Sequence, residues 1–396
     1  MAKRITKRQA KQVVKAVKKM SPIHIIVAII ILIVAVGGYF VYTKLIKKPD
    51  LAPLGEVEFH FFTLGNASSG DSVYIRAGDN DILIDGGSDY DSIDDIESYV
   101  NQFVKDDTLE YVIVTHGDMD HIACFAGEAS GESLFDKYEV KTIIDFPKTN
   151  KDTKVYNRYL SERQQEVDDG NTVHYTALEC YKNENGAQRI YNLSADGNIK
   201  MEILYNYYYE NNSNHENDYS VCLMFHHGSK KFLFTGDLEE KGEEKLVELN
   251  NLSQVEFYKA GHHGSKTSSH DVLLDVIKPK ICVVPCVAGN AEYTDTIKNQ
   301  FPTQDFIDRI AKHTKLVYVP SIGALDYING AESGFVELNG DIVVVSTGEK
   351  TIPATDTEPA KIIPAAVTVK CEKNDTVLKD TAWFKQYRTT PAEWLN

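Results

Sequence analysis

The stretch that most constrains the fold is residues 111–121, where a short apolar run is followed at once by four side chains that can bind metal. Residues 111–114 have the composition of a buried β-strand. The four side chains that follow it within six positions are His116, Asp118, Asp120 and His121. A strand end that presents two imidazoles and two carboxylates can direct several of them at one point. We therefore expect a metal site at the edge of a sheet.

Strands and helices alternate along most of the chain, which indicates an α/β layered domain over residues 56–348. We expect strands at 57–63, 72–76, 81–84, 111–115, 141–145, 201–205, 219–225, 231–235, 255–258, 281–285, 316–319 and 342–346. We expect helices at 89–104, 155–167, 238–249, 269–277 and 303–311. Residues 349–396 are predicted to be a Pro/Thr spacer and a C-terminal tail, which either packs back on the domain or binds something else.

The first 55 residues differ in composition from the rest of the chain. Residues 25–42 carry no charge over 18 positions, a length that suits a membrane span. Eight Lys or Arg residues precede this run and three follow it closely, so the positive-inside rule places the N-terminus in the cytoplasm. We predict a single-pass protein of the cell membrane. It would have a basic cytoplasmic segment (1–22), a transmembrane anchor (23–43), a linker (44–55) and an extracellular domain. A cleaved signal peptide is the alternative, but no A-x-A site follows the run.

The charge of the predicted extracellular part argues against a polyanion held by bulk electrostatics. Residues 1–48 hold 11 of the 42 Lys and Arg residues and no acidic residue, which leaves 31 basic against 58 acidic residues, a balance of −27. A nucleic acid would therefore need a local site, with metal, to overcome the repulsion.

Two other predicted strands also end in metal-capable side chains. "FLFTGD" ends on Asp237, and the strand at 255–258 leads into "HHGSKTS" at residues 262–268. Together with H-x-D-x-D-H, these motifs resemble the metallo-β-lactamase superfamily, and within it the extracellular hydrolase domain of ComEC-type competence proteins. The resemblance covers residues 56–346. It implies an αββα four-layer sandwich, here preceded by one N-terminal transmembrane helix.

The resemblance also implies roles for individual residues. The implied ligands are His116 and Asp118 for one metal ion, and Asp120, His121 and His263 for the other, with Asp237 as a bridge and Asp85 bracing the His loop from behind. Asp120, His262 and Lys266 are expected to take part in catalysis, and Ser265, Lys266 and Thr267 to hold the substrate. The third ligand of the first ion stays open between His215, Asn217, Asp218, Ser220 and none.

Such a site implies two divalent ions, Zn or Mn, about 3.5–4 Å apart, which activate a water as hydroxide. Asp118 adds a hard oxygen ligand, which favours Mn and argues against β-lactam hydrolysis. The expected function is a metal-dependent phosphodiesterase or nuclease whose substrate is a phosphodiester, DNA being one option. The alternatives are a cell-envelope phosphodiester or phosphocholine esterase, and a binding protein with a degenerate site. The sequence identifies no protein partner.

Overall fold

The computed structural model describes residues 55–129, 131–323, 334–352 and 361–395. The predicted basic segment, the predicted transmembrane anchor and all but the last residue of the predicted linker lie outside them. Among the helices within the described ranges, none combines the length and the apolar composition that a membrane crossing requires.

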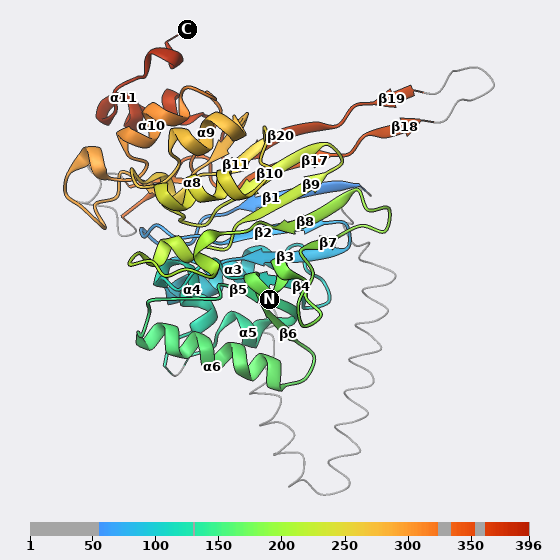
Figure 1. The fold of residues 1–396 in the computed structure, drawn as a ribbon. Coiled ribbons are helices and arrows are strands. Elements are labelled where there is room, and N and C mark those ends of the chain that lie inside the picture. Colours follow the sequence, from blue (N-terminus) through green and yellow to red (C-terminus); the bar gives the residue numbers. More distant parts are fainter. Residues whose placement is uncertain (1–54, 130, 324–333, 353–360, 396) are drawn as a thin grey trace, which may run out of the picture.

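Two β-sheets form the centre of the domain (Figure 1). The first sheet has eight strands in the order β20-β17-β1-β2-β3-β4-β5-β6, and the second has seven in the order β14-β12-β11-β10-β9-β8-β7. The first contains β1 (Glu56–Phe61), β2 (Val73–Ala77), β3 (Asn80–Ile84), β4 (Thr108–Ile113), β5 (Glu139–Asp145), β6 (Val173–Thr176), β17 (Ile342–Thr347) and β20 (Ala366–Cys371). The second contains β7 (Ile190–Asn192), β8 (Ile199–Ile203), β9 (Leu223–His227), β10 (Lys230–Phe234), β11 (Phe257–Lys259), β12 (Ile281–Val283) and β14 (Val317–Tyr318).

Helices cover the outer faces of the two sheets (Figure 1). The first sheet is covered by α3 (Ile93–Val100), α4 (Met119–Ala126), α5 (Leu134–Lys137) and α6 (Lys154–Asp168), and α7 (Ala177–Lys182) follows β6. The second sheet is covered by α8 (Glu240–Leu249), α9 (Asp271–Ile277) and α10 (Gln304–Ile310), with α11 (Ala382–Tyr387) beside them. Helices on the outside of two facing sheets confirm the expected α/β sandwich.

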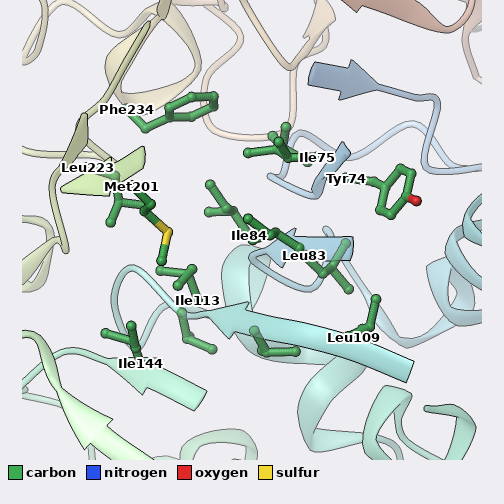
Figure 2. Packing of buried hydrophobic residues seen from close by; sticks show 14 of the residues in the cluster. Tyr74, Ile75, Leu83, Ile84, Leu109, Ile113, Ile144, Met201, Leu223 and Phe234 are labelled. Carbon is green, nitrogen blue, oxygen red and sulfur yellow. The ribbon is translucent and has the colours of Figure 1, made fainter. Parts of the chain in front are cut away.

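The two sheets pack through aromatic and branched side chains that alternate along their strands. Ile75 and Ile84 of the first sheet share one buried cluster with Met201, Leu223 and Phe234 of the second (Figure 2). Every second residue of a strand points to the same face, so Tyr74 and Leu83 belong to the cluster from the opposite face of the first sheet. Each fully buried side chain of this size contributes about 1.5–3 kcal/mol, so burial on both faces of the first sheet stabilises the domain.

Parallel strand pairing determines where the functional side chains lie. β3, β4, β5 and β6 run parallel in the first sheet, and β10, β11, β12 and β14 run parallel in the second. The carboxyl ends of parallel strands meet at one edge, which is where α/β folds bind their ligands. Asp85, His116, Asp237 and His262 all follow such ends.

Two local predictions were wrong. The expected strand at 219–225 begins only at Leu223, because residues Glu216–Tyr219 form a 3-10 helix. We expected the residues after β4 to form a loop, but Met119–Ala126 form helix α4, and Asp120 and His121 lie in its first turn. The apolar residues at 122–126 are buried, and this burial stabilises the helix.

The C-terminal tail packs on the domain. β20 pairs antiparallel with β17 along six residues at the edge of the first sheet. Trp383, Phe384 and Trp394 join a second buried cluster between the second sheet and its helices. The Trp394 indole also donates a hydrogen bond to the Thr314 carbonyl at 2.9 Å. The tail therefore contributes both a strand and core side chains.

Replacing Phe384, which is fully buried, should therefore destabilise the whole domain. We expect Phe384→Ala to lower the free energy of unfolding by about 3–5 kcal/mol, because it removes a large side chain from a packed core. Leu395→Ala is the control, since Leu395 is 72% exposed, and it should change stability by no more than about 0.5 kcal/mol. Equal denaturant midpoints for the two variants would contradict this packing.

Candidate metal centre

The ends of β4 and β10 come together where the two sheets meet. The Val221 amide donates to the Thr115 carbonyl at 2.9 Å, which links the residues after β4 to those before β9. Gly236 lies at φ 53° in this junction, and a Cβ there would lie 2.8 Å from the Ser220 hydroxyl oxygen. Glycine is needed because both the left-handed backbone and the close approach exclude a side chain. Asp237 follows directly and enters the junction.

Three imidazoles converge at this junction, and each is fully buried. His121 Nδ1 lies 2.8 Å from Asp85 Oδ2, and His263 Nδ1 lies 2.9 Å from the Pro285 carbonyl. His116 Nδ1 lies 3.1 Å from the Thr115 hydroxyl. A carboxylate or carbonyl partner requires Nδ1–H to donate, which leaves Nε2 as the free nitrogen.

The Nε2 atoms of His116, His121 and His263 are buried and have no hydrogen-bond partner among the described residues. Asp237 Oδ2 lies 3.3 Å from His121 Nε2 and 3.4 Å from His263 Nε2. Buried polar atoms without partners are costly, and a cation that binds several at once removes that cost. The donor set of imidazole and carboxylate fits a divalent transition-metal ion.

Ligand atoms within 4.8 Å of one another define three groups of metal-capable side chains in the described part of the chain. The groups are His116, His121 and Asp237; Asp120, His121 and His263; and Asp71, Asp85 and His121. The first two contain five of the six residues predicted as ligands. The sixth, Asp118, belongs to none of the three.

Asp118 lies at the border of the centre. Its carboxylate forms an ion pair with Lys151, and its Oδ2 is 3.4 Å from His116 Nε2. Burial raises the pKa of Asp118, but His116 and Lys151 outweigh burial and hold the pKa below its ordinary value. Asp118 is therefore a charged neighbour of His116 that is already paired with a lysine.

Asp85 lies behind the imidazoles. Its carboxylate accepts hydrogen bonds from the Thr115 amide at 2.7 Å and from the Thr115 hydroxyl at 2.8 Å, and it also contacts His121 Nδ1. Asp85 adopts φ 61°, which is uncommon for a residue with a side chain and is often found at functional sites. These contacts fix the orientation of His121.

None of the four residues proposed as the third ligand of the first ion joins the imidazoles. His215 is exposed beside Glu239, Asn217 contacts His262, and the Ser220 hydroxyl accepts from the Asp237 amide. Asp218 accepts a hydrogen bond from Ser213.

The segment that carries these four residues contributes a buried carboxylate instead. Glu216 accepts hydrogen bonds from the Gly117 amide at 3.0 Å and the Asn150 amide at 2.6 Å. It therefore ties the His116 loop to the segment that carries Lys151. Glu216 lies among the four residues proposed as the third ligand, but nothing in the sequence spacing distinguished it from them.

The loop after β11 places His262 and His263 differently. Both adopt positive φ, 48° and 51°, and such strained backbone often occurs at functional sites. His263 points into the centre, whereas His262 Nδ1 lies 3.0 Å from the Thr267 hydroxyl and its Nε2 is 3.9 Å from Asp237 Oδ2. Burial holds the pKa of His262 below its ordinary value, so its imidazole is neutral at pH 7.

Ser265, Lys266 and Thr267 follow His263 and Gly264 in the chain, and the Thr267 hydroxyl contacts His262. Lys266 is exposed, and the Ser265 and Thr267 hydroxyls are 3.1 Å apart. Lys266 and Thr267 also line a cavity of about 580 Å³, together with Tyr208, Asn212, Ser213, Asn214, His215, Asp218, Glu239, Glu240, Lys241 and His270. The structure thus places the predicted substrate loop between this cavity and the metal centre.

Four contributors to the site were not predicted. Asp71 and Lys259 form a buried ion pair behind the imidazoles. The Tyr293 hydroxyl donates to Asp120 Oδ2 at 3.2 Å. Phe301 packs on His263, with ring centroids 5.8 Å apart.

The tail holds the segment that carries Phe301. Arg388 is buried and donates hydrogen bonds to the Gln300 carbonyl at 2.7 Å and the Pro302 carbonyl at 3.1 Å. The residues on either side of Phe301 are therefore fixed by an arginine from the last ten residues of the chain.

Charges in the centre shift one another's protonation. Burial lowers the pKa of His263, but Asp237 and Asp71 outweigh burial and raise the pKa to about 10. The pKa of His121 is likewise held well above its usual value, because Asp237 and Asp85 outweigh burial. Burial alone would raise the pKa of Asp237, but His121 and His263 hold it well below its usual range.

Comparison with known proteins agrees with this geometry. Residues 65–129 and 213–286 match the metallo-β-lactamase superfamily. The two matched segments contain all six residues predicted as metal ligands. Members of this superfamily are generally metal-dependent hydrolases.

Two curated relatives are competence proteins. ComE operon protein 3 of Bacillus subtilis is 25% identical over 225 residues, which cover 55% of this chain and 24% of the relative. Competence protein ComA of Neisseria gonorrhoeae is 36% identical over 116 residues, 28% of this chain and 16% of the relative. The aligned part thus spans about a quarter or less of each relative. The predicted resemblance to the superfamily and its competence-protein branch is confirmed.

Among solved structures, the metallo-β-lactamase fold protein YhfI from Bacillus subtilis is 14% identical. The alignment covers 69% of this chain and 90% of YhfI, with a TM-score of 0.36.

Asp85 provides a test of the candidate metal centre. We expect Asp85→Ala to weaken metal affinity about 10–100-fold, because the ligand His121 loses the carboxylate that orients it. Titration calorimetry with Mn²⁺ or Zn²⁺ measures the change. Asp79→Ala, which removes an exposed carboxylate between β2 and β3, should leave the affinity unchanged.

Metal binding should also release protons. The raised pKa values of His121 and His263 mean that both imidazoles are protonated at pH 7 before metal binds. A metal ion must displace these protons, so we expect release of roughly one to two protons per ion and an affinity that rises with pH. Calorimetry in buffers of different ionisation enthalpy measures the release. A binding enthalpy that is the same in every buffer would contradict the prediction.

Proposed function

We propose that this domain is a metal-dependent phosphodiesterase, with DNA as the first candidate substrate. The proposal rests on three buried imidazole Nε2 atoms that have no hydrogen-bond partner among the described residues. They converge on the Asp237 carboxylate, next to the Ser265–Thr267 loop. The relation to competence proteins supports nuclease activity in particular.

The metal ions would be held by His116, His121 and Asp237 on one side and by Asp120, His121 and His263 on the other. Two divalent ions, Zn or Mn, would polarise the phosphoryl group and lower the pKa of water at this site. Asp118 would add its carboxylate on the His116 side. Lys151 already pairs with it, so the first position has the weaker ligand set.

The remaining residues would bind the substrate and move protons. The Lys266 ammonium and the Ser265 and Thr267 hydroxyls are donors that suit phosphate oxygens. His262 has a lowered pKa and a neutral imidazole, so it can accept a proton close to Asp237. Asp120, fixed by the Tyr293 hydroxyl and by His263, orients the reacting water.

We further propose that residues 23–43 anchor the chain in the cell membrane with its N-terminus in the cytoplasm. Eight basic residues before the apolar run and three close behind it support this orientation. The hydrolase would then act outside the cell, on a phosphodiester in the extracellular space or the cell envelope.

The negative charge of the cavity and of the chain favours a second function. The cavity beside Lys266 is lined by three carboxylates, Asp218, Glu239 and Glu240, and the chain from residue 49 onward has a balance of −27. Both features repel a polyanion and suit a small phosphodiester of the cell envelope, such as one that carries choline. The alternative is therefore an envelope phosphodiesterase or phosphocholine esterase with the same metal centre.

Hydrolysis by the full-length chain tests the proposal. We expect release of p-nitrophenol from bis(p-nitrophenyl) phosphate that depends on added Mn²⁺ or Zn²⁺. Asp120→Ala should lower kcat/KM about a hundredfold or more, because the variant loses a carboxylate of the metal centre. Asp79→Ala should retain the parent activity, since Asp79 is exposed in the turn between β2 and β3, at the opposite end of β3 from Asp85.

The substrate separates the candidates. Cleavage of single-stranded DNA with the same metal dependence supports the nuclease, whereas activity on small diesters alone supports the envelope enzyme. An Asp120→Ala chain as active as the parent would overturn the metal mechanism. Metal stoichiometry near zero in saturating Mn²⁺ would instead indicate a binding protein with a degenerate site.

A further inference from the structure

Lys259 is a buried lysine behind the metal centre. It is the last residue of β11 and is 2% exposed. Its ammonium forms an ion pair with Asp71, lies 3.5 Å from Asp237 Oδ1 and donates to the Gly236 carbonyl at 3.3 Å. Lysine is almost never fully buried unless it is paired, so these contacts account for its presence here.

The ammonium lies where a third cation would otherwise be expected. Asp71, Asp85 and His121 form one of the three groups with metal-ligand spacing. In this group the Asp85 carboxylate forms hydrogen bonds with Thr115 and His121, and the Asp71 carboxylate forms an ion pair with Lys259. The third group therefore has a lysine as its cation.

Lys259 also contacts both sides of the ligand set. Asp237 directs Oδ1 toward Lys259 and Oδ2 toward the Nε2 atoms of two imidazoles. Asp71, the partner of Lys259, has its other oxygen 3.4 Å from His263 Nδ1. The Asp71–Lys259 pair thus contacts two predicted ligands on the side away from the metal: Asp237 through Oδ1 and His263 through Nδ1.

The surrounding charge explains why a cation is needed. Asp71, Asp85 and Asp237 are at most 2% exposed, and Asp120 lies among the same imidazoles. Buried carboxylates without a counter-charge strongly destabilise a fold. Many metal sites meet this cost only when the metal binds, and their folding then depends on metal.

We propose that Lys259 is a built-in counter-cation that holds Asp71 and Asp237 in place before any metal binds, so that the ligand set is preformed and folding does not depend on metal. Lys259 is a positioning residue in this role, since it acts through the two carboxylates. The inference rests on the metal centre proposed above, and the experiment below separates the two.

The melting temperature of the full-length chain in detergent tests the inference, measured with chelator and with saturating Mn²⁺ or Zn²⁺. Lys259→Met should melt about 5–10 °C lower than the parent in chelator, because two buried carboxylates lose their partner. With metal the loss should be less than half as large, because the bound cation replaces the missing charge. The metal-induced shift in melting temperature therefore increases in the variant.

Two further variants sharpen the result. Lys259→Met combined with Asp71→Asn removes both charges of the pair, and it should recover at least half of the stability lost in chelator. Lys312→Met removes an exposed lysine that is paired with Asp271, and it should lower both melting temperatures by the same small amount.

The outcomes are distinct. A Lys259→Met chain that loses the same stability with and without metal, and is not rescued by Asp71→Asn, overturns the inference while the metal centre stands. So does a failure of both Lys259 variants to fold even in saturating metal. A parent chain whose melting temperature does not respond to metal overturns the proposed metal centre, and this inference with it.

Discussion

The rest of the site depends on the mutual neutralisation of buried charges at the junction of the two sheets. Carboxylates from strand ends in both sheets meet three imidazoles and one lysine in a space without exposure to solvent. In such surroundings each charge is tolerable only beside a partner. The positions of Asp85, Asp237 and Lys259 are therefore not independent, and each contact fixes the geometry of the next.

The arrangement of the site could be predicted from the sequence because it follows from local pattern. Asp85, His116, Asp237 and His263 each follow a short apolar run, and parallel strands bring such positions to one edge. The α/β sandwich follows from the same alternation of apolar runs and helical segments. These features depend on residues that are close together in the chain, so they can be predicted from the sequence.

What the sequence could not provide are contacts between residues far apart in the chain. Lys259 is one lysine among many, and only its burial beside Asp71, 188 positions earlier, gives it a role. The pairing of Asp118 with Lys151 and the clamp that Glu216 forms on Gly117 depend equally on tertiary structure. The helix at 119–126 was missed because the ligand spacing within it also suits a loop.

The position of Arg388 affects the order in which the candidate site becomes complete during synthesis. A nascent chain that has emerged up to β17 already contains every predicted ligand, yet it lacks β20, α11 and the arginine that fixes the residues around Phe301. The wall over His263 is completed only when the last segment folds. A chain without β20 and α11 would therefore carry the full set of predicted ligands without a finished enclosure of the candidate centre.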